Sequence, residues 1–181
     1  MARVPYVTQD DLDAEYQDLI VSSLQPGKTV NVYSAIGNNG PVLKGFRDFL
    51  GSLWDHSGLT DRQRELVILT AASTVENDYE WHQHVNIAGG DLVSTEELAA
   101  IADGDDSVFE GAEHALVQYA RAVVEGEVTD DLHDALAEHL DDAAVSGAAC
   151  TAAGYLGLGR TIDALGVEVE SYDEFVGWHP E

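Results

Sequence analysis

Glu80 and His84, four residues apart in the segment YEWHQH, are the side chains of this sequence best suited to moving protons. On an α-helix this spacing places both side chains on one face. A carboxylate beside an imidazole raises the histidine pKa and, with partial burial, holds it near neutrality, where the ring both takes and gives a proton. Glu65 borders the apolar face of the preceding predicted helix. Glu80 and His84 are therefore candidates for acid/base chemistry, with Glu65 as a further carboxylate on the packed face of the preceding helix.

The Glu80–His84 spacing also has two other interpretations. An exposed pair would be an ordinary ion pair on a helix surface. Glutamate and histidine one turn apart can also bind one metal ion, so metal binding by Glu65, Glu80 and His84 stays open, although it is not favoured. His82 and His84 are weaker candidates for a shared metal ion, because side chains two positions apart on a helix point about 200° away from each other. Spacing alone does not decide between an ion pair, acid/base catalysis and a metal site.

Helices must position these residues, because apolar side chains recur at helical spacing almost throughout and no stretch alternates long enough to predict a strand. We expect an all-α fold, an antiparallel helical bundle in a single domain over residues 1–181, with residues 1–27 as an N-terminal helical extension. Trp54 is predicted to belong to the core. The predicted helices span residues 9–23, 30–36, 41–56, 61–75, 78–88, a short segment after Ser94, 108–124, 130–139 and 141–165.

Two sequence signals mark where helices begin. Thr60 followed by Gln63, and Ser94 followed by Glu97, match the capping box, in which each side chain bonds the other residue's backbone N–H. Helices are therefore predicted to begin directly after Thr60 and after Ser94.

The charge of the chain excludes several classes of partner. Its 181 residues include 34 acidic and 8 basic side chains, which gives a formal net charge of −26. Nucleic acids and anionic membranes are bound by basic surfaces, so neither is an expected partner. A uniform negative charge repels itself at low salt and is tolerated where counterions are abundant, as in halophiles. We therefore hypothesise a protein from a salt-accumulating organism.

The expected location is the cytoplasm. Cys150 is the only cysteine, so neither an intrachain disulfide nor a CxxC pair can form. The N-terminal residues MARVPYVTQDDLD lack the basic and then apolar run of a signal peptide. The uncharged stretch from Ala143 to Gly159 is shorter than a membrane-spanning helix and rich in alanine and glycine, so we predict tight packing inside the bundle.

Nearly the whole chain resembles the carboxymuconolactone decarboxylase family, which is part of the AhpD-like all-helical superfamily. The resemblance implies an AhpD-like antiparallel bundle that assembles as a homo-oligomer, a dimer, trimer or hexamer, with a site near a subunit boundary. The most specific part is YEWHQH after RELVIL. The other matching segments are RVPYVT, NVYSAIGNNGPVLKGF, GLTDRQRELVIL, YEWHQHVNIA and GRTIDALGVEVE.

The resemblance also implies roles for individual residues. Redox members of the family use a CxxCxxxH motif and an upstream glutamate as a proton relay, and the matching positions here are Glu65 and His84 for the relay. Asn77 and Glu80 occupy the two cysteine positions. This chain is thus a variant without the redox pair, and Cys150 on another predicted helix does not replace it. Without a thiolate there is no peroxide-reducing nucleophile.

The decarboxylase branch implies a different chemistry for the same site. His84 would move a proton at a substrate carbon or lactone oxygen, Glu65 would tune it, and Glu80 would act as a second carboxylate. Tyr79, Trp81 and His82 are the expected substrate-binding residues, in part as apolar walls that exclude water.

We therefore expect an acid/base enzyme of decarboxylase, lyase or isomerase type that acts on a small carbonyl or lactone acid without a metal or other cofactor. An alkylhydroperoxidase-like antioxidant is one alternative, which would need the missing thiols. A non-catalytic oligomer that binds a small ligand is the other.

Overall fold

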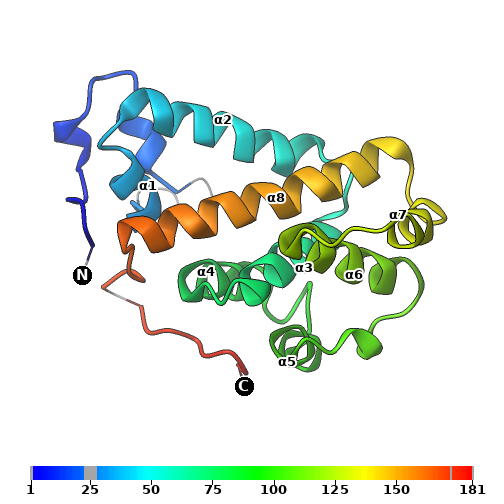
Figure 1. The fold of residues 1–181 in the computed structure, drawn as a ribbon. Helices are drawn as coiled ribbons and strands as arrows, with labels where there is room; N and C mark the ends of the chain where they lie inside the picture. The colour runs from blue at the N-terminus through cyan, green and yellow to red at the C-terminus, as the bar shows by residue number, and fades with distance from the viewer. Residues whose placement is uncertain (1, 23–27, 172, 181) are drawn as a thin grey trace. The chain divides into compact units, whose positions relative to one another are not determined.

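Helices make up the regular secondary structure of residues 2–22, 28–171 and 173–180, the part of the chain that this computed structural model describes (Figure 1). These ranges contain three short 3-10 helices, two isolated β-bridges and no strand, so the predicted all-α class is confirmed. The α-helices are α1 (Asn31–Ile36), α2 (Gly40–His56), α3 (Asp61–Thr74), α4 (Asp78–Ala88), α5 (Thr95–Asp103), α6 (Gly111–Glu125), α7 (Asp130–Ala137) and α8 (Asp142–Leu165).

Contacts within the chain divide it into two compact units. Unit 1 comprises Met1–Ser52 and Arg160–Glu174, and unit 2 comprises Leu53–Gly159 and Phe175–Glu181. The division falls within α2 and within α8, so each of these helices contributes to both units. The expected single domain over residues 1–181 stays a prediction.

The predicted helix over residues 9–23 is wrong. Its described part forms two 3-10 helices, Gln9–Asp11 and Gln17–Ile20, with extended backbone at Leu12. The Asp11 carboxylate accepts hydrogen bonds from the Thr8 backbone N–H at 2.8 Å and from the Thr8 hydroxyl at 2.7 Å. Thr8 and Asp11 thus form a capping box that begins the first 3-10 helix, and the extended backbone at Leu12 (φ −107°, ψ 147°) ends it after one turn. The N-terminal extension is therefore helical only in these short turns, and residues 23–27 lie outside the described residues.

Most other helix boundaries follow the sequence prediction. Thr60 and Gln63 form the expected capping box before α3, and Ser94 and Glu97 form one before α5. The helix predicted from residue 108 begins instead at Gly111, because Asp106–Val108 forms a separate 3-10 turn.

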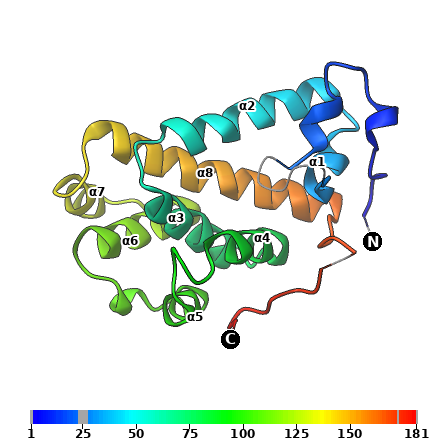
Figure 2. The ribbon, with the colours of Figure 1, turned by 180° about the vertical axis from the view of Figure 1, so that it is seen from behind.

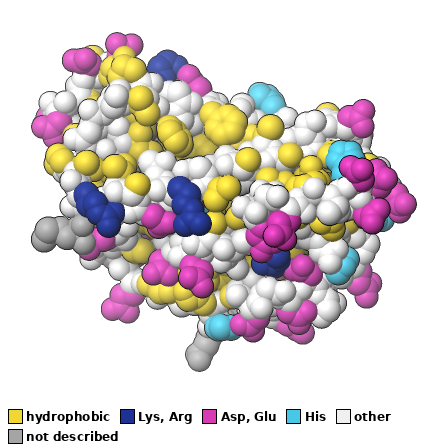
Figure 3. All heavy atoms as spheres, viewed as in Figure 1, with side chains coloured by type: hydrophobic (Ala, Val, Ile, Leu, Met, Phe, Trp, Pro, Cys, Tyr) yellow, Lys and Arg dark blue, Asp and Glu magenta, His cyan; other side chains and the backbone are white. Residues whose placement is uncertain are grey.

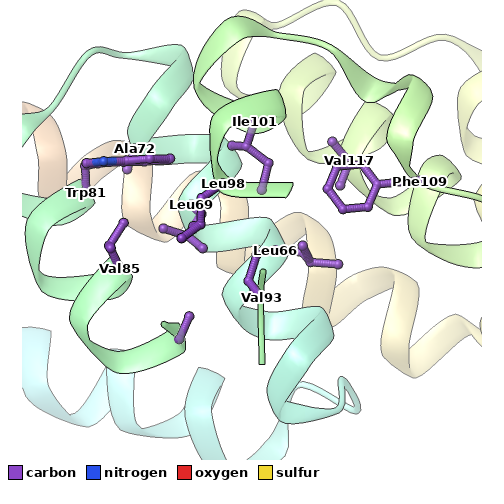
Figure 4. Close-up of a cluster of buried hydrophobic side chains, with 11 residues drawn as sticks. Leu66, Leu69, Ala72, Trp81, Val85, Val93, Leu98, Ile101, Phe109 and Val117 are labelled. Carbon is purple, nitrogen blue, oxygen red and sulfur yellow. The ribbon is translucent and has the colours of Figure 1, made fainter. Parts of the chain in front are cut away.

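Helix α3 is the central element of unit 2. It contacts α4, α5 and α6, and the two opposite views in Figures 1 and 2 both show it between α4 and α6. Leu66 and Leu69 belong to one hydrophobic cluster with residues of α4, α5 and α6, seen in Figure 4, and Val67 belongs to a second cluster with residues of α6, α7 and α8. Every residue from position 64 to 72 is buried, so a polar side chain on α3 is removed from water.

Helix α8 packs closely through its small residues, as predicted. A Cβ atom added at Gly147 would lie 1.9 Å from the backbone oxygen of Ser57, so only glycine allows this approach. Among the described residues, no helix combines the length and the apolar character needed to cross a bilayer.

Candidate active site

The turn between α3 and α4 places the candidate residues. Glu76 ends the α3 segment with a positive φ of 54°, and Asn77 caps α4 by accepting a hydrogen bond from the Glu80 backbone N–H at 2.9 Å. The Asn77 amide also donates to the backbone oxygen of Gly159 at 3.1 Å. Asn77, at a position that the family resemblance assigns to cysteine, therefore starts the helix that carries Glu80 and His84.

Glu65, Glu80 and His84 come together in unit 2, and we call them the Glu–His–Glu cluster. The His84 Nδ1 atom lies 2.8 Å from Oε2 of Glu65, and its Nε2 atom lies 3.7 Å from Oε2 of Glu80. Because a carboxylate accepts, Nδ1 is the nitrogen that donates to Glu65. The relative exposures are 0% for Glu65, 4% for Glu80 and 5% for His84. Such burial excludes the interpretation of Glu80 and His84 as an ordinary surface ion pair.

The surroundings change the proton affinities of two members of the cluster. Burial raises the pKa of Glu80 to about 7, an effect that His84 opposes and Glu65 reinforces. Burial by itself lowers the pKa of His84, but the charge and hydrogen bond of Glu65, with help from Glu80, raise it above 6.5. The imidazole of His84 therefore holds a proton more tightly than a free histidine does, beside a carboxyl group whose own pKa is about 7, so the cluster can both give and take a proton.

Three further side chains surround the cluster. Trp54, from the end of α2, and Tyr155, from α8, have ring centroids 6.2 Å and 5.1 Å from that of His84. Arg64 is buried, and its Nε atom lies 3.6 Å from Oε1 of Glu65. Sequence reasoning assigned Trp54 to the core and did not select Tyr155. Spacing could not have identified them, since only the packing of α2 and α8 residues in unit 2 brings them to His84.

The residues expected to bind substrate are placed differently. Trp81 is fully buried in the cluster of Figure 4, donates from Nε1 to the Gly177 backbone oxygen at 2.8 Å, and stacks on Trp178. The backbone N–H of Val176 donates to Nδ1 of His82 at 3.3 Å. Positions 81 and 82 lie on a different side of α4 from positions 80 and 84, which explains why they contact the C-terminal segment.

Tyr79 is also buried, with 3% of its surface exposed. Trp81 and His82 contact residues 176–178 in the structure, and their role in substrate binding stays a prediction. Substrate binding by Tyr79 stays a prediction.

Metal binding has little geometric support in this cluster. Glu65 and Glu80 approach opposite ring nitrogens of His84, so the two carboxylates and one nitrogen do not converge on a single point. Among the described residues no group of three or more histidine, cysteine, aspartate or glutamate side chains could hold an ion. The expectation of a site without metal stays a prediction.

Comparison with known proteins supports the resemblance seen in the sequence. Residues 40–125 match the model of the carboxymuconolactone decarboxylase family. This matched range contains all three members of the Glu–His–Glu cluster. No curated protein matches the sequence.

Solved structures share the fold at low sequence identity. A cysteine-to-alanine variant of the debrominase Bmp8, in complex with 2,3,4-tribromopyrrole, aligns with a TM-score of 0.80 at 16% identity over 94% of this chain and 93% of that chain. An alkylhydroperoxidase AhpD core protein from Ralstonia eutropha, described as an uncharacterized peroxidase-related protein, aligns at 0.79 and 18% over 99% and 98%. A protein of unknown function from Agrobacterium tumefaciens aligns at 0.68 and 18% over 74% and 93%. These likenesses confirm the AhpD-like helical fold.

Proposed function

We propose that this chain, whose residues 40–125 match the model of the carboxymuconolactone decarboxylase family, is an acid/base enzyme that acts on a small carbonyl or lactone acid without a thiol. The reaction would be a decarboxylation, another lyase reaction or an isomerisation. One observation carries the proposal: a buried imidazole whose two nitrogens face two different carboxyl groups. Burial of this cluster strengthens its internal electrostatic interactions and excludes water from a proton transfer.

Each member of the cluster has a distinct role in this proposal. Glu65 accepts the Nδ1–H bond, which fixes the tautomer of His84 and stabilises the imidazolium form. His84 moves the proton through Nε2, and the 3.7 Å separation from Glu80 must shorten to hydrogen-bond distance when a proton passes between the two groups. Glu80, with a pKa raised to about 7, supplies the second proton as a carboxylic acid.

The protons balance in both types of reaction. In an isomerisation, the neutral form of His84 takes a proton from one substrate atom and Glu80 gives one to another, after which the proton returns from His84 to Glu80. In a decarboxylation, the carbon–carboxylate bond breaks, carbon dioxide leaves, the electron pair of the bond stays on the substrate carbon, and Glu80 protonates that carbon. His84 then reprotonates Glu80 and recovers its own proton from solvent.

Thiol peroxidase activity is not part of the proposal. The positions that the resemblance assigns to the cysteine pair are occupied by Asn77 and Glu80, and neither side chain can form a disulfide. Cys150 is exposed on α8 and lies outside the Glu–His–Glu cluster.

Turnover on a panel of small lactones and carbonyl acids tests the proposal. His84→Gln and Glu65→Gln are each expected to lower the rate roughly 100-fold or more, the contribution of a positioned acid or base. The control is His139→Gln, because His139 is exposed on another part of unit 2 and should not affect the rate. Full activity in both cluster variants, on a substrate that the wild type converts, would contradict the assignment.

Two further proposals follow from the family resemblance. The chain is proposed to form a homo-oligomer, which light scattering coupled to size-exclusion chromatography would detect as a mass that is a multiple of 19.5 kDa. Its site is proposed to work without a bound metal, so dialysis against a chelator should leave turnover unchanged.

A further inference from the structure

We infer that Arg64, Trp54 and Tyr155 are positioning residues that hold the Glu65–His84 pair in one orientation; their catalytic relevance rests on the proposed function. Together these five side chains form a closed circuit of contacts, which we call the positioning ring. All five lie in unit 2 and come from α2, α3, α4 and α8.

The circuit can be followed one contact at a time from His84. Its Nδ1 bonds Oε2 of Glu65 at 2.8 Å, and the other Glu65 oxygen lies 3.6 Å from Nε of Arg64. The Arg64 guanidinium carbon lies 4.0 Å from the centre of the Trp54 ring. Trp54 Nε1 donates to the Tyr155 hydroxyl at 2.8 Å, and the Tyr155 ring meets the His84 ring edge-on, at 87° and 5.1 Å between centroids.

The Arg64 end of the ring controls charge. Its side chain is buried and its Nε has no hydrogen-bond partner, while its Nη1 donates to Asp61 Oδ1 at 3.0 Å and to the Trp54 backbone oxygen at 3.3 Å. The face of Trp54 adds a cation–π contact. This placement keeps a cation beside the Glu65 carboxylate. The same cation opposes protonation of His84, so Arg64 and Glu65 act on the imidazole in opposite directions.

The Tyr155 end of the ring controls orientation. A single hydrogen bond from Nδ1 to Glu65 leaves the imidazole free to tilt about that bond. The perpendicular Tyr155 ring restricts this tilt, and the Trp54 N–H bond restricts the Tyr155 ring in turn. Catalytic groups lose much of their effect when displaced by even a small distance, so this restriction is where the ring would contribute to turnover.

The test follows the His84 ring by NMR in protein labelled with ¹⁵N-histidine, and it needs no substrate. His84→Gln assigns the signals by their loss. Tyr155→Phe removes the acceptor of the Trp54 N–H while keeping the ring. The exchange of the His84 Nδ1 proton with water is then expected to accelerate roughly 2- to 12-fold, the range that corresponds to one lost hydrogen bond.

Trp54→Phe removes the other half of the same hydrogen bond and should have a similar effect. The double variant should exchange no faster than the faster single variant, because both changes break one interaction. Tyr119→Phe is the matched control, since Tyr119 is as buried as Tyr155 at 6% exposure but packs in the cluster around Leu116.

An unchanged exchange rate in Tyr155→Phe and Trp54→Phe, or an equal acceleration in Tyr119→Phe, would overturn the inference. The result is independent of the proposed function. Accelerated exchange in the variants, without turnover of any substrate by the wild type, would support the positioning ring and contradict the proposed reaction. Turnover by the wild type, with unchanged exchange in the variants, would support the reaction and contradict the positioning ring.

Discussion

Replacing Glu80 by glutamine is expected to stabilise the fold at alkaline pH and to leave it nearly unchanged at acidic pH. The reason is that Glu80 is buried beside Glu65 and its pKa is raised from 4.5 to about 7. A carboxyl group with a raised folded-state pKa favours the folded chain while protonated. Its ionisation costs stability progressively as the pH rises from about 4.5 to about 7, and the full cost is present above that range.

The size of the effect follows from the shift. A change of one pKa unit corresponds to 1.36 kcal/mol, so a rise from 4.5 to about 7 costs about 3 kcal/mol once Glu80 is ionised. Glutamine has nearly the same shape and no charge to bury. Glu80→Gln is therefore expected to gain up to about 3 kcal/mol of unfolding free energy at pH 9, and about none at pH 4.5, where Glu80 is protonated in the folded chain.

Urea unfolding at pH 4.5 and pH 9, in concentrated salt at both, measures this difference. Glu138→Gln is the control, because Glu138 is exposed at the end of α7, and its replacement should give the same small change at both pH values. If Glu80→Gln changes the unfolding free energy equally at pH 4.5 and pH 9, Glu80 is not a carboxyl group that is costly to ionise, and the reasoning is refuted. Loss of turnover in the stabilised variant would show that this cost serves function.

Three further changes test the packing and the charge of the molecule. Gly147→Ala should lower the free energy of unfolding in urea by about 1–3 kcal/mol, because the added Cβ would overlap the Ser57 backbone oxygen. Gly157→Ala has open space at its Cβ and should raise that free energy by about 0.5–1 kcal/mol. Equal effects of the two changes would contradict this packing. Trp178→Ala should cost about 1–3 kcal/mol by removing the stack on Trp81, and an unchanged urea midpoint would show that the C-terminal contact contributes nothing. Dialysis into dilute buffer should cause cooperative loss of the helical circular dichroism signal, because a net charge of −26 repels itself when salt no longer screens it. Acidic side chains are spread over the face in Figure 3. A fold retained without salt would reject the halophile hypothesis.

Local signals in the sequence were sufficient for most of the helices. The capping boxes at Thr60 and Ser94 predicted where α3 and α5 begin, because their hydrogen bonds join residues three positions apart. The prediction for the N-terminal segment was wrong for another reason. Thr8 and Asp11 also form a capping box, but the backbone becomes extended at Leu12, a break that the apolar spacing of residues 9–23 does not reveal.

The site could be predicted only in part. Glu80 and His84 follow from helical spacing, and Glu65 follows from the family pattern, and the structure brings the three together. Trp54 and Tyr155 are separated from His84 by 30 and 71 positions, so no spacing rule connects them to it.

Proximity in sequence was also misleading. Trp81 lies next to Glu80 but contacts Gly177 and Trp178, because neighbouring residues on a helix point in different directions.

The pH titration of the His84 ring nitrogens, in wild-type protein and in Glu65→Gln, tests the central claim most directly. We expect a wild-type His84 pKa above 6.5 that falls in Glu65→Gln, because the carboxylate that favours the imidazolium is lost while burial remains. A wild-type His84 that titrates at about 6.5, as an exposed histidine does, and that does not respond to Glu65→Gln would contradict a coupled, buried acid/base cluster.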